Sequence, residues 1–413
     1  MINKEKLING NTLPLLALFI ANGVSMTGNM LSTIAIPWFV LQTTGSATQM
    51  GLVGFFTIIP IVLAGLLGGV LVDTVGFKKT SIIADLSSGV TVIFIPLFYL
   101  TVGLPFWLLL ILVFLGALLD APGSTARSAM LPELAERSGM SFERASSINQ
   151  VVERSSRLLG APLAGILIIL MGSANVLWFD GLSFFFSAVL IGIFVKLSTS
   201  DETKYINKSY FEELMVGFKF IFQNQLLFSI VIIVMMTNFL DSAFSSVIRP
   251  VYVNKIFGSS LALGLIIAAN GGGAMFGAFL FGWIGHWFPR RLIFISMFIF
   301  TSFRFVFYIF YPPLWVILLS TFIFSVSAGP LNPIIDAIEF ECIPVNLRGR
   351  VLGSITAGMW IAMPLSILVS GVLVDQFGIF PMILGIGFIY FVTTVSLVFL
   401  PSLRLMGGKN EIK

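Results

Sequence analysis

Residues 68–79 read Gly-Gly-Val-Leu-Val-Asp-Thr-Val-Gly-Phe-Lys-Lys, and they stand where a long apolar run gives way to a short basic segment. The glycines allow two backbones to approach closely. Asp73 lies at the rim of the apolar run, and Lys78 and Lys79 follow it. Charged groups avoid a bilayer core and collect at its surface. This stretch therefore predicts a loop at a membrane surface, and we expect it to act as a hinge between two halves of the chain.

The composition is that of a protein that crosses a membrane many times. Of the 413 residues, 57% are hydrophobic and 10% are charged, whereas a soluble domain carries about 25% charged residues. Apolar runs of about 20 residues, long enough to cross a bilayer core, recur along the chain. The runs are continuous rather than alternating, which favours helices over a β-barrel. We therefore expect an all-α membrane protein.

Twelve membrane-spanning helices are predicted. Their approximate bounds are 13–40, 49–72, 80–100, 105–126, 145–170, 175–197, 220–248, 259–284, 291–311, 313–335, 350–373 and 380–401. The longest polar break divides the chain into two halves of six helices, residues 1–197 and 219–413. Residues 198–218 are expected to form a cytoplasmic linker between them. The second part of this linker has the pattern of a short surface helix, and a solvated linker without further structure is the alternative.

The basic residues predict which way the chain faces. Of the 23 Lys and Arg residues, 20 fall in loops and flanks on the side that holds both termini. Only Arg249 and Lys255 fall on the opposite side, and Arg304 lies within a span. Because basic loops stay in the cytoplasm, we expect both termini to be cytoplasmic and the protein to span the plasma membrane.

The two halves carry similar sequences. Residues 37–46 near the end of the first span and residues 250–259 near the end of the seventh both read Pro-x-aromatic-Val, then four residues, then Gly-Ser. Two similar halves in a membrane protein predict a site for a small molecule at mid-membrane between them, opened alternately to each side.

The opening stretch, written Gly69-x-Leu-x-Asp73-x-x-Gly76-x-Lys-Lys79, resembles the signature between spans 2 and 3 of the major facilitator superfamily. The resemblance extends over essentially the whole chain. It implies the major facilitator fold, with twelve helices in two pseudo-symmetric halves of six.

Further motifs resemble one branch of this superfamily. In span 5, an element similar to one of proton-coupled antiporters contains Gly160, Pro162 and Gly165. Residues 346–351, 362–364 and 371–378 are similar to the macrolide-efflux branch of drug/proton antiporters. This resemblance implies secondary active transport by alternating access, with proton-coupled efflux of amphipathic drug-like compounds such as macrolides. Export or import of a natural metabolite, siderophore or lipid on the same scaffold is the alternative.

One departure concerns proton coupling. Many relatives carry an arginine in span 4, about where Gly116 stands here, and that arginine is often tied to coupling. The resemblance therefore leaves the coupling route open in this chain.

The resemblance also implies a cytoplasmic gate. A carboxylate can cap the N-terminus of another helix, and the family pattern would place Asp73 against the start of span 11. The alternative is an ordinary aspartate at a helix end, beside two lysines. The expected gating residues are Gly69, Asp73, Gly76, Lys78, Lys79, Arg348 and Arg350.

Ionisable residues inside spans are costly and are candidates for function. The candidates for proton coupling are Asp120, Glu153, Asp241 and Arg304. Glu153 has a structural alternative, because Arg157 lies one helical turn away. Arg304 is expected either to pair with a carboxylate such as Asp241 or to face a water-filled cleft. Asp85 and Asp180 lie nearer span ends and are interpreted as structural.

Two helices carry a polar stripe at helical spacing. The expected cavity-lining residues are Asn22, Ser25, Asn29 and Ser32 in span 1, with Asn238, Ser242 and Ser245 in span 7. Polar stripes in membranes face protein or water rather than lipid, so both stripes predict walls of a central cavity. Hydrogen bonding between helices is the alternative.

Several functions are disfavoured by composition. A single histidine, His286, and a single cysteine, Cys342, make a metal site or a catalytic cluster improbable, so we expect no enzyme. No nucleotide-binding motif is present, so we expect no cofactor, with the proton gradient as energy source. The expected partners are a small-molecule substrate and the lipid bilayer, with no nucleic acid, and the protein is expected to function as a monomer.

Overall fold

The structure, a computed structural model, describes residues 12–195, 210–344 and 347–406, without the side chains of residues 64–74, 210–214 and 286. The chain divides into two compact units. The first unit contains residues 1–45, 52–204 and 259–264, and the second contains residues 46–51, 205–258 and 265–413. Each unit thus includes the first residues of a helix that continues in the other unit.

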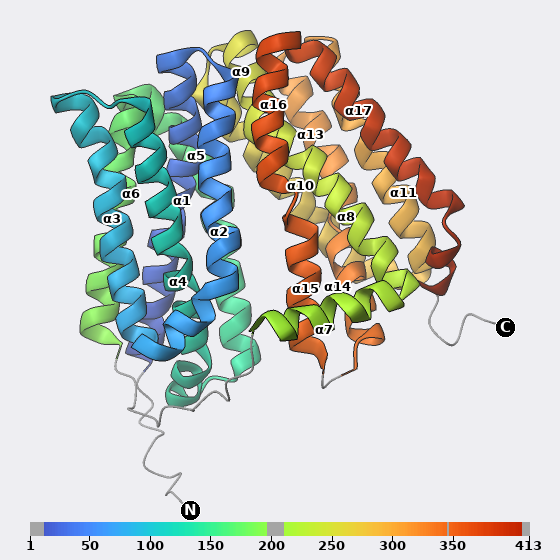
Figure 1. The fold of residues 1–413 in the computed structure, drawn as a ribbon, viewed down its shortest axis with the longest axis horizontal. Helices are drawn as coiled ribbons and strands as arrows, with labels where there is room; N and C mark the ends of the chain where they lie inside the picture. The colour runs from blue at the N-terminus through green and yellow to red at the C-terminus, as the bar shows by residue number, and fades with distance from the viewer. Residues whose placement is uncertain (1–11, 196–209, 345–346, 407–413) are drawn as a thin grey trace, which may run out of the picture. The chain divides into compact units, whose positions relative to one another are not determined.

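Six long helices form most of the first unit (Figure 1, blue to green). They are α1 (Leu13–Thr44), α2 (Ala47–Val75), α3 (Phe77–Thr101), α4 (Phe106–Ser138), α5 (Phe142–Met171) and α6 (Ser173–Phe194). Helix α1 packs against α4, α5 and α6, and α3 packs against α4 and α6. Side chains from α3, α4 and α6 can therefore meet those of α1 inside this unit.

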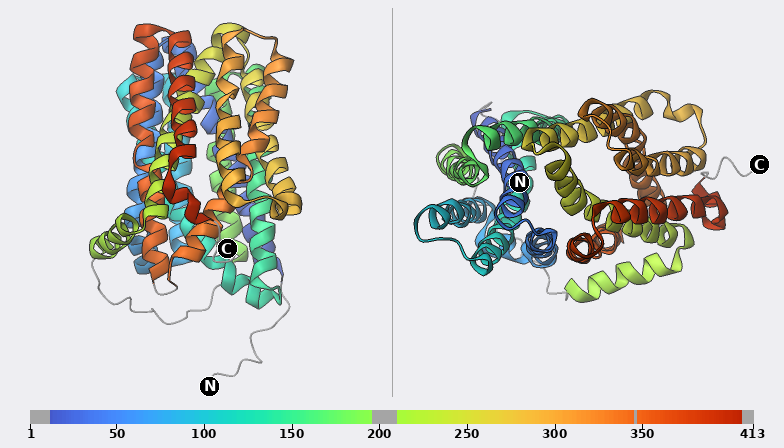
Figure 2. Two further views of the ribbon diagram at one scale, coloured as in Figure 1. Left: turned by 90° about the vertical axis from the view of Figure 1, so that its right-hand side faces the viewer. Right: turned by 90° about the horizontal axis from the view of Figure 1, so that it is seen from above.

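The second unit contains shorter helices that combine into spans (Figure 1, green to red). They are α7 (Tyr210–Gln223), α8 (Gln225–Ala243), a π-helix (Phe244–Ile248), α9 (Arg249–Phe257), α10 (Ser260–Ile284), α11 (Arg290–Ser302), α12 (Arg304–Ile309), α13 (Leu314–Ala328), α14 (Leu331–Cys342), α15 (Arg348–Trp360), α16 (Met363–Phe377) and α17 (Ile379–Ser396). In Figure 2 the long helices within each unit run side by side.

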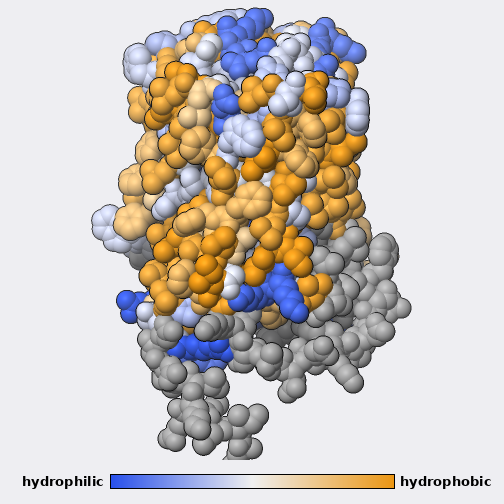
Figure 3. Space-filling model, turned by 90° about the vertical axis from the view of Figure 1, so that its left-hand side faces the viewer, coloured by the Kyte–Doolittle hydropathy of each residue, from blue (hydrophilic) through white to orange (hydrophobic). Residues whose placement is uncertain are grey.

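The predicted all-α fold with twelve spans is confirmed. Eleven segments of the described chain are long and apolar enough to cross a membrane, and the described apolar part of α2, Ala47–Leu63, is shorter. The face drawn in Figure 3 carries an apolar band between hydrophilic ends. Interruptions within spans at the π-helix, Phe303, Gly329 and Ile361 were not predicted.

Helix α4 is longer than predicted span 4. The span was predicted to end near residue 126, whereas the helix continues to Ser138, where Gly139 follows with a left-handed φ of 75°. The extension is stabilised by burial, because Met130 and Leu134 pack in one apolar cluster with Leu15 of α1 and Ile191 of α6. Arg127, assigned to a loop, is consequently a helical residue of α4.

The short helix predicted in the second part of the linker is present as α7. It packs against α15, and Figure 1 shows it lying across the end of the neighbouring helices of its unit. The first part of the predicted linker, residues 198–209, lies outside the described residues.

Asp375, near the end of α16, caps the start of α2 within the second unit. Its carboxylate accepts hydrogen bonds from the backbone N–H groups of Ala47 (3.0 Å) and Thr48 (2.8 Å) and from the hydroxyl of Ser46 (2.8 Å). A Cβ atom on Gly371 would lie 2.5 Å from the carbonyl oxygen of Ala47. Glycine at this position therefore permits the close approach that the cap requires.

We predict that Asp375→Ala lowers the free energy of unfolding by about 1 kcal/mol, the typical cost of losing a capping side chain. Asp375→Asn retains an acceptor oxygen and is expected to lose less. Chemical unfolding of the purified protein in detergent micelles measures both changes. Equal stability of Asp375→Ala and the native chain would contradict the capping role.

Candidate functional site

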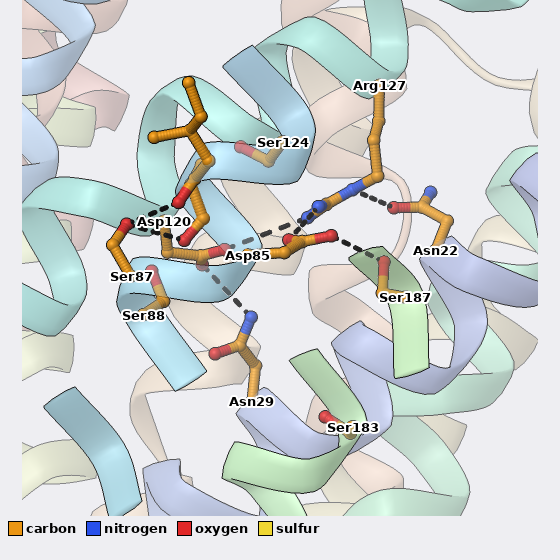
Figure 4. A network of polar contacts seen from close by, with 12 residues as sticks. Asn22, Asn29, Asp85, Ser87, Ser88, Asp120, Ser124, Arg127, Ser183 and Ser187 are labelled. Carbon is orange, nitrogen blue, oxygen red and sulfur yellow. Dashed lines mark hydrogen bonds and ion pairs between the residues drawn. The ribbon is translucent and has the colours of Figure 1, made fainter. Parts of the chain in front are cut away.

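A buried ion pair lies at the centre of a polar network in the first unit (Figure 4). The Nη1 atom of Arg127 on α4 lies 2.5 Å from Oδ1 of Asp85 on α3. The two side chains are 2% and 0% exposed. Such a pair is costly to remove from water and is stable only when its remaining polar atoms are satisfied.

Neighbouring helices supply the remaining partners of this pair. The second carboxylate oxygen of Asp85 accepts a hydrogen bond from Ser187 of α6 at 2.7 Å. Nε of Arg127 donates to the amide oxygen of Asn22 of α1 at 3.2 Å, and Asn22 donates to Asn149 of α5 at 2.8 Å. The network therefore joins α1, α3, α4 and α6, as Figure 4 shows, and reaches α5 through Asn149.

Asp120 is a second carboxylate beside Arg127. Its Oδ1 atom lies 3.8 Å from Nη2 of Arg127, and its Oδ2 atom accepts a hydrogen bond from Asn29 of α1 at 3.1 Å. Oδ1 itself is buried and makes no hydrogen bond with a described residue. The Asp120 side chain is 23% exposed. Arg127 thus has one tightly bound carboxylate and one weakly bound carboxylate that is more accessible.

Asp180 of α6 is a third, fully buried carboxyl group. Its Oδ2 atom accepts a hydrogen bond from Ser32 of α1, and its Oδ1 atom has no hydrogen-bond partner among the described residues. A Cβ atom on Gly28 would lie 2.6 Å from Oδ1 of Asp180. The absence of a side chain at Gly28 therefore allows α1 and α6 to approach at this carboxyl group.

The charges of this network are unbalanced. If Asp85, Asp120 and Asp180 were all ionised, Arg127 would neutralise only one of them. Uncompensated charge in a membrane interior is costly. Binding of a proton to Asp120 or Asp180 removes that cost, so the arrangement is chemically suited to hold and release protons.

Sequence reasoning found Asp120 but missed its partners. Arg127 was assigned to a cytoplasmic loop, and Asp85 and Asp180 were interpreted as structural. The spacing of Asp120 and Arg127, seven residues or about two helical turns, places them on the same face if the helix continues. That continuation is the signal that could have found the pair.

The polar stripe of span 1 forms hydrogen bonds between helices. Asn22, Asn29 and Ser32 each contact a different charged residue, and the hydroxyl of Ser25 is buried without a hydrogen-bond partner in the described chain. These contacts correspond to the alternative interpretation. Lining of a cavity by this stripe remains a prediction.

The stripe of span 7 behaves similarly in the second unit. Asn238 donates a hydrogen bond to the carbonyl oxygen of Met359 at 3.2 Å, and the hydroxyl of Ser242 lies 3.3 Å from that of Ser366. Ser245 is half-buried within the π-helix. The role of these three residues in a cavity stays a prediction.

The other two charged candidates in spans contact each other. Asp241 of α8 pairs with Arg304 of α12, as the sequence suggested. Glu153 is half-buried on α5 and forms no ion pair with any described residue, so the suggested pairing with Arg157 is not present. A role of Glu153, Asp241 or Arg304 in proton coupling stays a prediction.

The antiporter-like element packs against the start of α10 in the first unit. The carbonyl oxygen of Gly165 accepts a hydrogen bond from the hydroxyl of Ser260 at 3.0 Å, and a Cβ atom on Gly165 would lie 2.7 Å from Cα of Leu261. Gly160 lies against Met30 of α1, and Pro162 lies within α5 beside Gly264. These contacts show close helix packing, and a role in antiport is not tested by them.

The predicted gate is described only in part. Asp73 and Gly69 fall among the residues whose side chains are not described. Gly76 has a φ of 89° and precedes α3, and the ammonium group of Lys78 donates to the carbonyl oxygen of Gly192 at 2.8 Å. Because the Asp73 side chain is not described, its expected relation to Lys79, Arg348 and Arg350 is not tested, and the gate stays a prediction.

Comparisons with known proteins agree with this architecture. A sequence model described as Major Facilitator Superfamily matches residues 18–240 and 231–411. Multidrug efflux pump Tap of Mycolicibacterium fortuitum is 28% identical over 395 residues, which cover 95% of this chain and 96% of that protein. Macrolide efflux protein A of Streptococcus pyogenes is 21% identical over 361 residues, or 86% and 88% of the two chains. The crystal structure of the nucleoside transporter NupG is similar with a TM-score of 0.73 and 15% identity, over 94% of this chain and 98% of that chain. This last likeness shows the fold alone.

We predict that Arg127→Gln is strongly destabilising, by about 3–5 kcal/mol, because it leaves Asp85 buried without a counter-charge. The double variant Asp85→Asn with Arg127→Gln removes both charges and is expected to recover much of this loss. Unfolding of both variants and of Asp85→Asn in detergent micelles completes the thermodynamic cycle. A double variant no more stable than Arg127→Gln would show that the ion pair is not the cause.

Proposed function

Because the chain belongs to the Major Facilitator Superfamily and is a membrane transporter, we propose that it exports amphipathic drug-like compounds, such as macrolides, in exchange for protons. Two relatives support this substrate class, since they are named as multidrug and macrolide efflux proteins. The observation that carries the coupling proposal is the position of Arg127 between two carboxylates, Asp85 and Asp120.

Asp120 is the proposed proton carrier. Its side chain is partly accessible, whereas Asp85 is fully buried, so a proton reaches Asp120 more readily. An ionised Asp120 attracts the guanidinium group of Arg127, and a protonated Asp120 does not. Protonation therefore leaves Arg127 paired with Asp85 alone, and release of the proton draws Arg127 towards Asp120.

A shift of Arg127 would act on α1. Arg127 donates to Asn22 and Asp120 accepts from Asn29, so one position of α1 is tied to the group that changes charge and another to its arginine partner. In alternating access one half of a transporter rocks against the other, and an ion that binds the two states differently shifts the equilibrium between them. The proposed role of α1 is to transmit the charge state of Asp120 to the substrate path.

The proposed orientation follows from the charge pattern. The excess of basic residues on the side of the termini favours cytoplasmic termini and a plasma-membrane location. Asp73 is proposed to act in a cytoplasmic gate, and the monomer is proposed as the functional form.

We predict that everted membrane vesicles take up radiolabelled erythromycin when a proton gradient is applied, and that a protonophore abolishes the uptake. Asp120→Asn is expected to reduce the uptake to the level of protonophore-treated vesicles, because the side chain can no longer exchange a proton. The matched control is Glu136→Gln, an exposed carboxylate on the same helix, which is expected to leave uptake unchanged. Uptake by native vesicles that persists with the protonophore, without proton movement, would refute proton antiport.

A second prediction concerns the proposed gate. Asp73→Asn is expected to impair transport while leaving expression largely intact, because the loss of charge weakens the cap on another helix. Quantitative immunoblotting and vesicle uptake measure the two quantities in the same preparation. Unchanged transport would remove Asp73 from the gate.

A further inference from the structure

Two helix interruptions flank a pair of charged residues in the second unit. Asp241 stands three residues before the π-helix Phe244–Ile248, and Arg249 begins α9 directly after it. The break between α11 and α12 falls at Phe303, so Arg304 is the first residue of α12. π-helical turns and broken helices inside membrane-length segments are frequent at functional sites. Both breaks here place a charged residue at their edge.

The three charged residues beside these two helix interruptions carry two positive charges and one negative charge. Arg304 pairs with Asp241, which is the sole carboxylate on α8, α9, α11, α12 and α17. Arg249 forms no ion pair and no hydrogen bond with any described residue, and its Nε atom is buried. Tyr252 lies one helical turn after Arg249 on α9, Tyr308 lies one turn after Arg304 on α12, and the centres of these two rings are 5.0 Å apart, so both arginines belong to one cluster. Two cations thus share one anion.

No described carboxylate of the second unit forms an ion pair with Arg249. Asp375 on α16 is engaged by the start of α2, and Glu341 on α14 pairs with Arg290. Asp336 and Glu339 also lie on α14, and neither forms an ion pair with Arg249. An arginine in this setting cannot lose its charge, so an external anion is the available means of neutralising it.

Aromatic side chains hold the cluster in place. The guanidinium carbon of Arg304 lies 4.7 Å from the ring centre of Phe305 and 5.2 Å from that of Tyr390. The ring of Tyr308 lies 5.0 Å from Tyr252, whose hydroxyl is buried without a hydrogen-bond partner in the described chain. The rings of Phe305 and Tyr390 keep water away from one side of the Arg304 guanidinium group, which strengthens its interaction with an anion.

The charged ends of the cluster remain accessible. The side chain of Asp241 is 37% exposed and that of Arg304 is 15% exposed. Arg249 is half-buried, and its terminal nitrogens are not among the buried atoms that lack partners. A ligand can therefore reach these nitrogens, although Nε of Arg249 is closed off.

We infer that Arg249 and Arg304 form a binding site for an organic anion, and that a carboxylate on the transported compound pairs with their guanidinium groups. Planar guanidinium and carboxylate groups match in geometry and form charge-assisted hydrogen bonds. Asp241 occupies Arg304 while the site is empty and competes with the ligand. The inference rests on the proposed function, because it narrows the amphipathic substrates to those that carry an anionic group.

The test compares two ligands of the same shape. The full chain is placed in nanodiscs of phosphatidylcholine at neutral pH, and binding of 2-naphthoate and of 2-naphthamide is measured by equilibrium dialysis. We expect the naphthoate to bind about tenfold more tightly than the amide, as one charge-assisted interaction provides. Equal affinity of the two ligands would overturn the inference.

Single substitutions on α9 test whether Arg249 belongs to the proposed anion-binding site. Arg249→Gln is expected to weaken naphthoate binding about tenfold and to leave naphthamide binding unchanged. Because Arg249 has no partner in the described chain, this change leaves no other charge unpaired. The control is Lys255→Gln, an exposed cation on the same helix, which is expected to have no effect. An unchanged naphthoate affinity in Arg249→Gln would exclude Arg249 from the site.

The variant Asp241→Asn tests whether the Asp241 carboxylate competes with the ligand for Arg304. Loss of the internal carboxylate is expected to tighten naphthoate binding, whereas the double variant Asp241→Asn with Arg304→Gln is expected to weaken it below the native value. The double variant avoids leaving Asp241 without its counter-charge, so it is expected to fold. Weaker binding in Asp241→Asn alone would contradict the assigned role of this residue.

Two further binding measurements distinguish an organic anion from the two other anions that could occupy the site, chloride and an anionic lipid headgroup. Replacing chloride by fluoride at equal concentration, or adding phosphatidylglycerol to the nanodisc, is expected to leave naphthoate binding unchanged. Markedly tighter naphthoate binding without chloride would identify an inorganic anion site, and loss of naphthoate binding with phosphatidylglycerol would identify a lipid site; either result overturns the inference. No proton gradient is used, so Asp120→Asn is expected to bind naphthoate normally, and failure of proton-coupled export would be seen only in the vesicle assay.

Discussion

The buried ion pair between Arg127 and Asp85 constrains the first unit more than any other contact. Both side chains are shielded from water, so neither can be left alone without a large energetic cost. Their remaining polar atoms are satisfied by Asn22 of α1 and Ser187 of α6. Four helices must therefore keep their relative positions for the pair to exist, and this requirement fixes where Asp120 stands in relation to the guanidinium group.

Helix α1 is the element that links this pair to the other carboxyl groups. Its polar residues recur at steps of three or four, so they lie on one face, and three of them contact Arg127, Asp120 and Asp180. A change of charge at Asp120 or Asp180 alters a hydrogen bond to this helix. The polar stripe of α1 thus holds the ionisable residues of the first unit in place by hydrogen bonds. It can contribute to transport only if those residues change charge.

The sequence predicted the spans and the polar face of α1 because both depend on periodicity and length, which are local properties. It did not predict the partners of Asp120. Arg127 follows an apolar run and was assigned to a loop, but packing of Met130 and Leu134 against α1 and α6 extends the helix past it. Asp180 was placed near the end of a predicted span, and only the structure, in which α1 approaches it at Gly28, shows that it is fully buried. The π-helix after Asp241 was missed for the same reason, since such interruptions depend on tertiary contacts rather than on residue type.

The buried polar clusters of the two units differ in the sign of their unbalanced charge and therefore in the ligand that can neutralise it. In the first unit the excess is negative, and a carboxylate can bind a proton and become neutral. In the second unit the excess is positive, and a guanidinium group keeps its charge in proteins, so only an anion can neutralise Arg249. The first arrangement is suited to a proton and the second to an anionic ligand. In the proposed exchange of protons for an anionic compound, the carboxylates of the first unit bind the proton and the arginines of the second unit bind the anion.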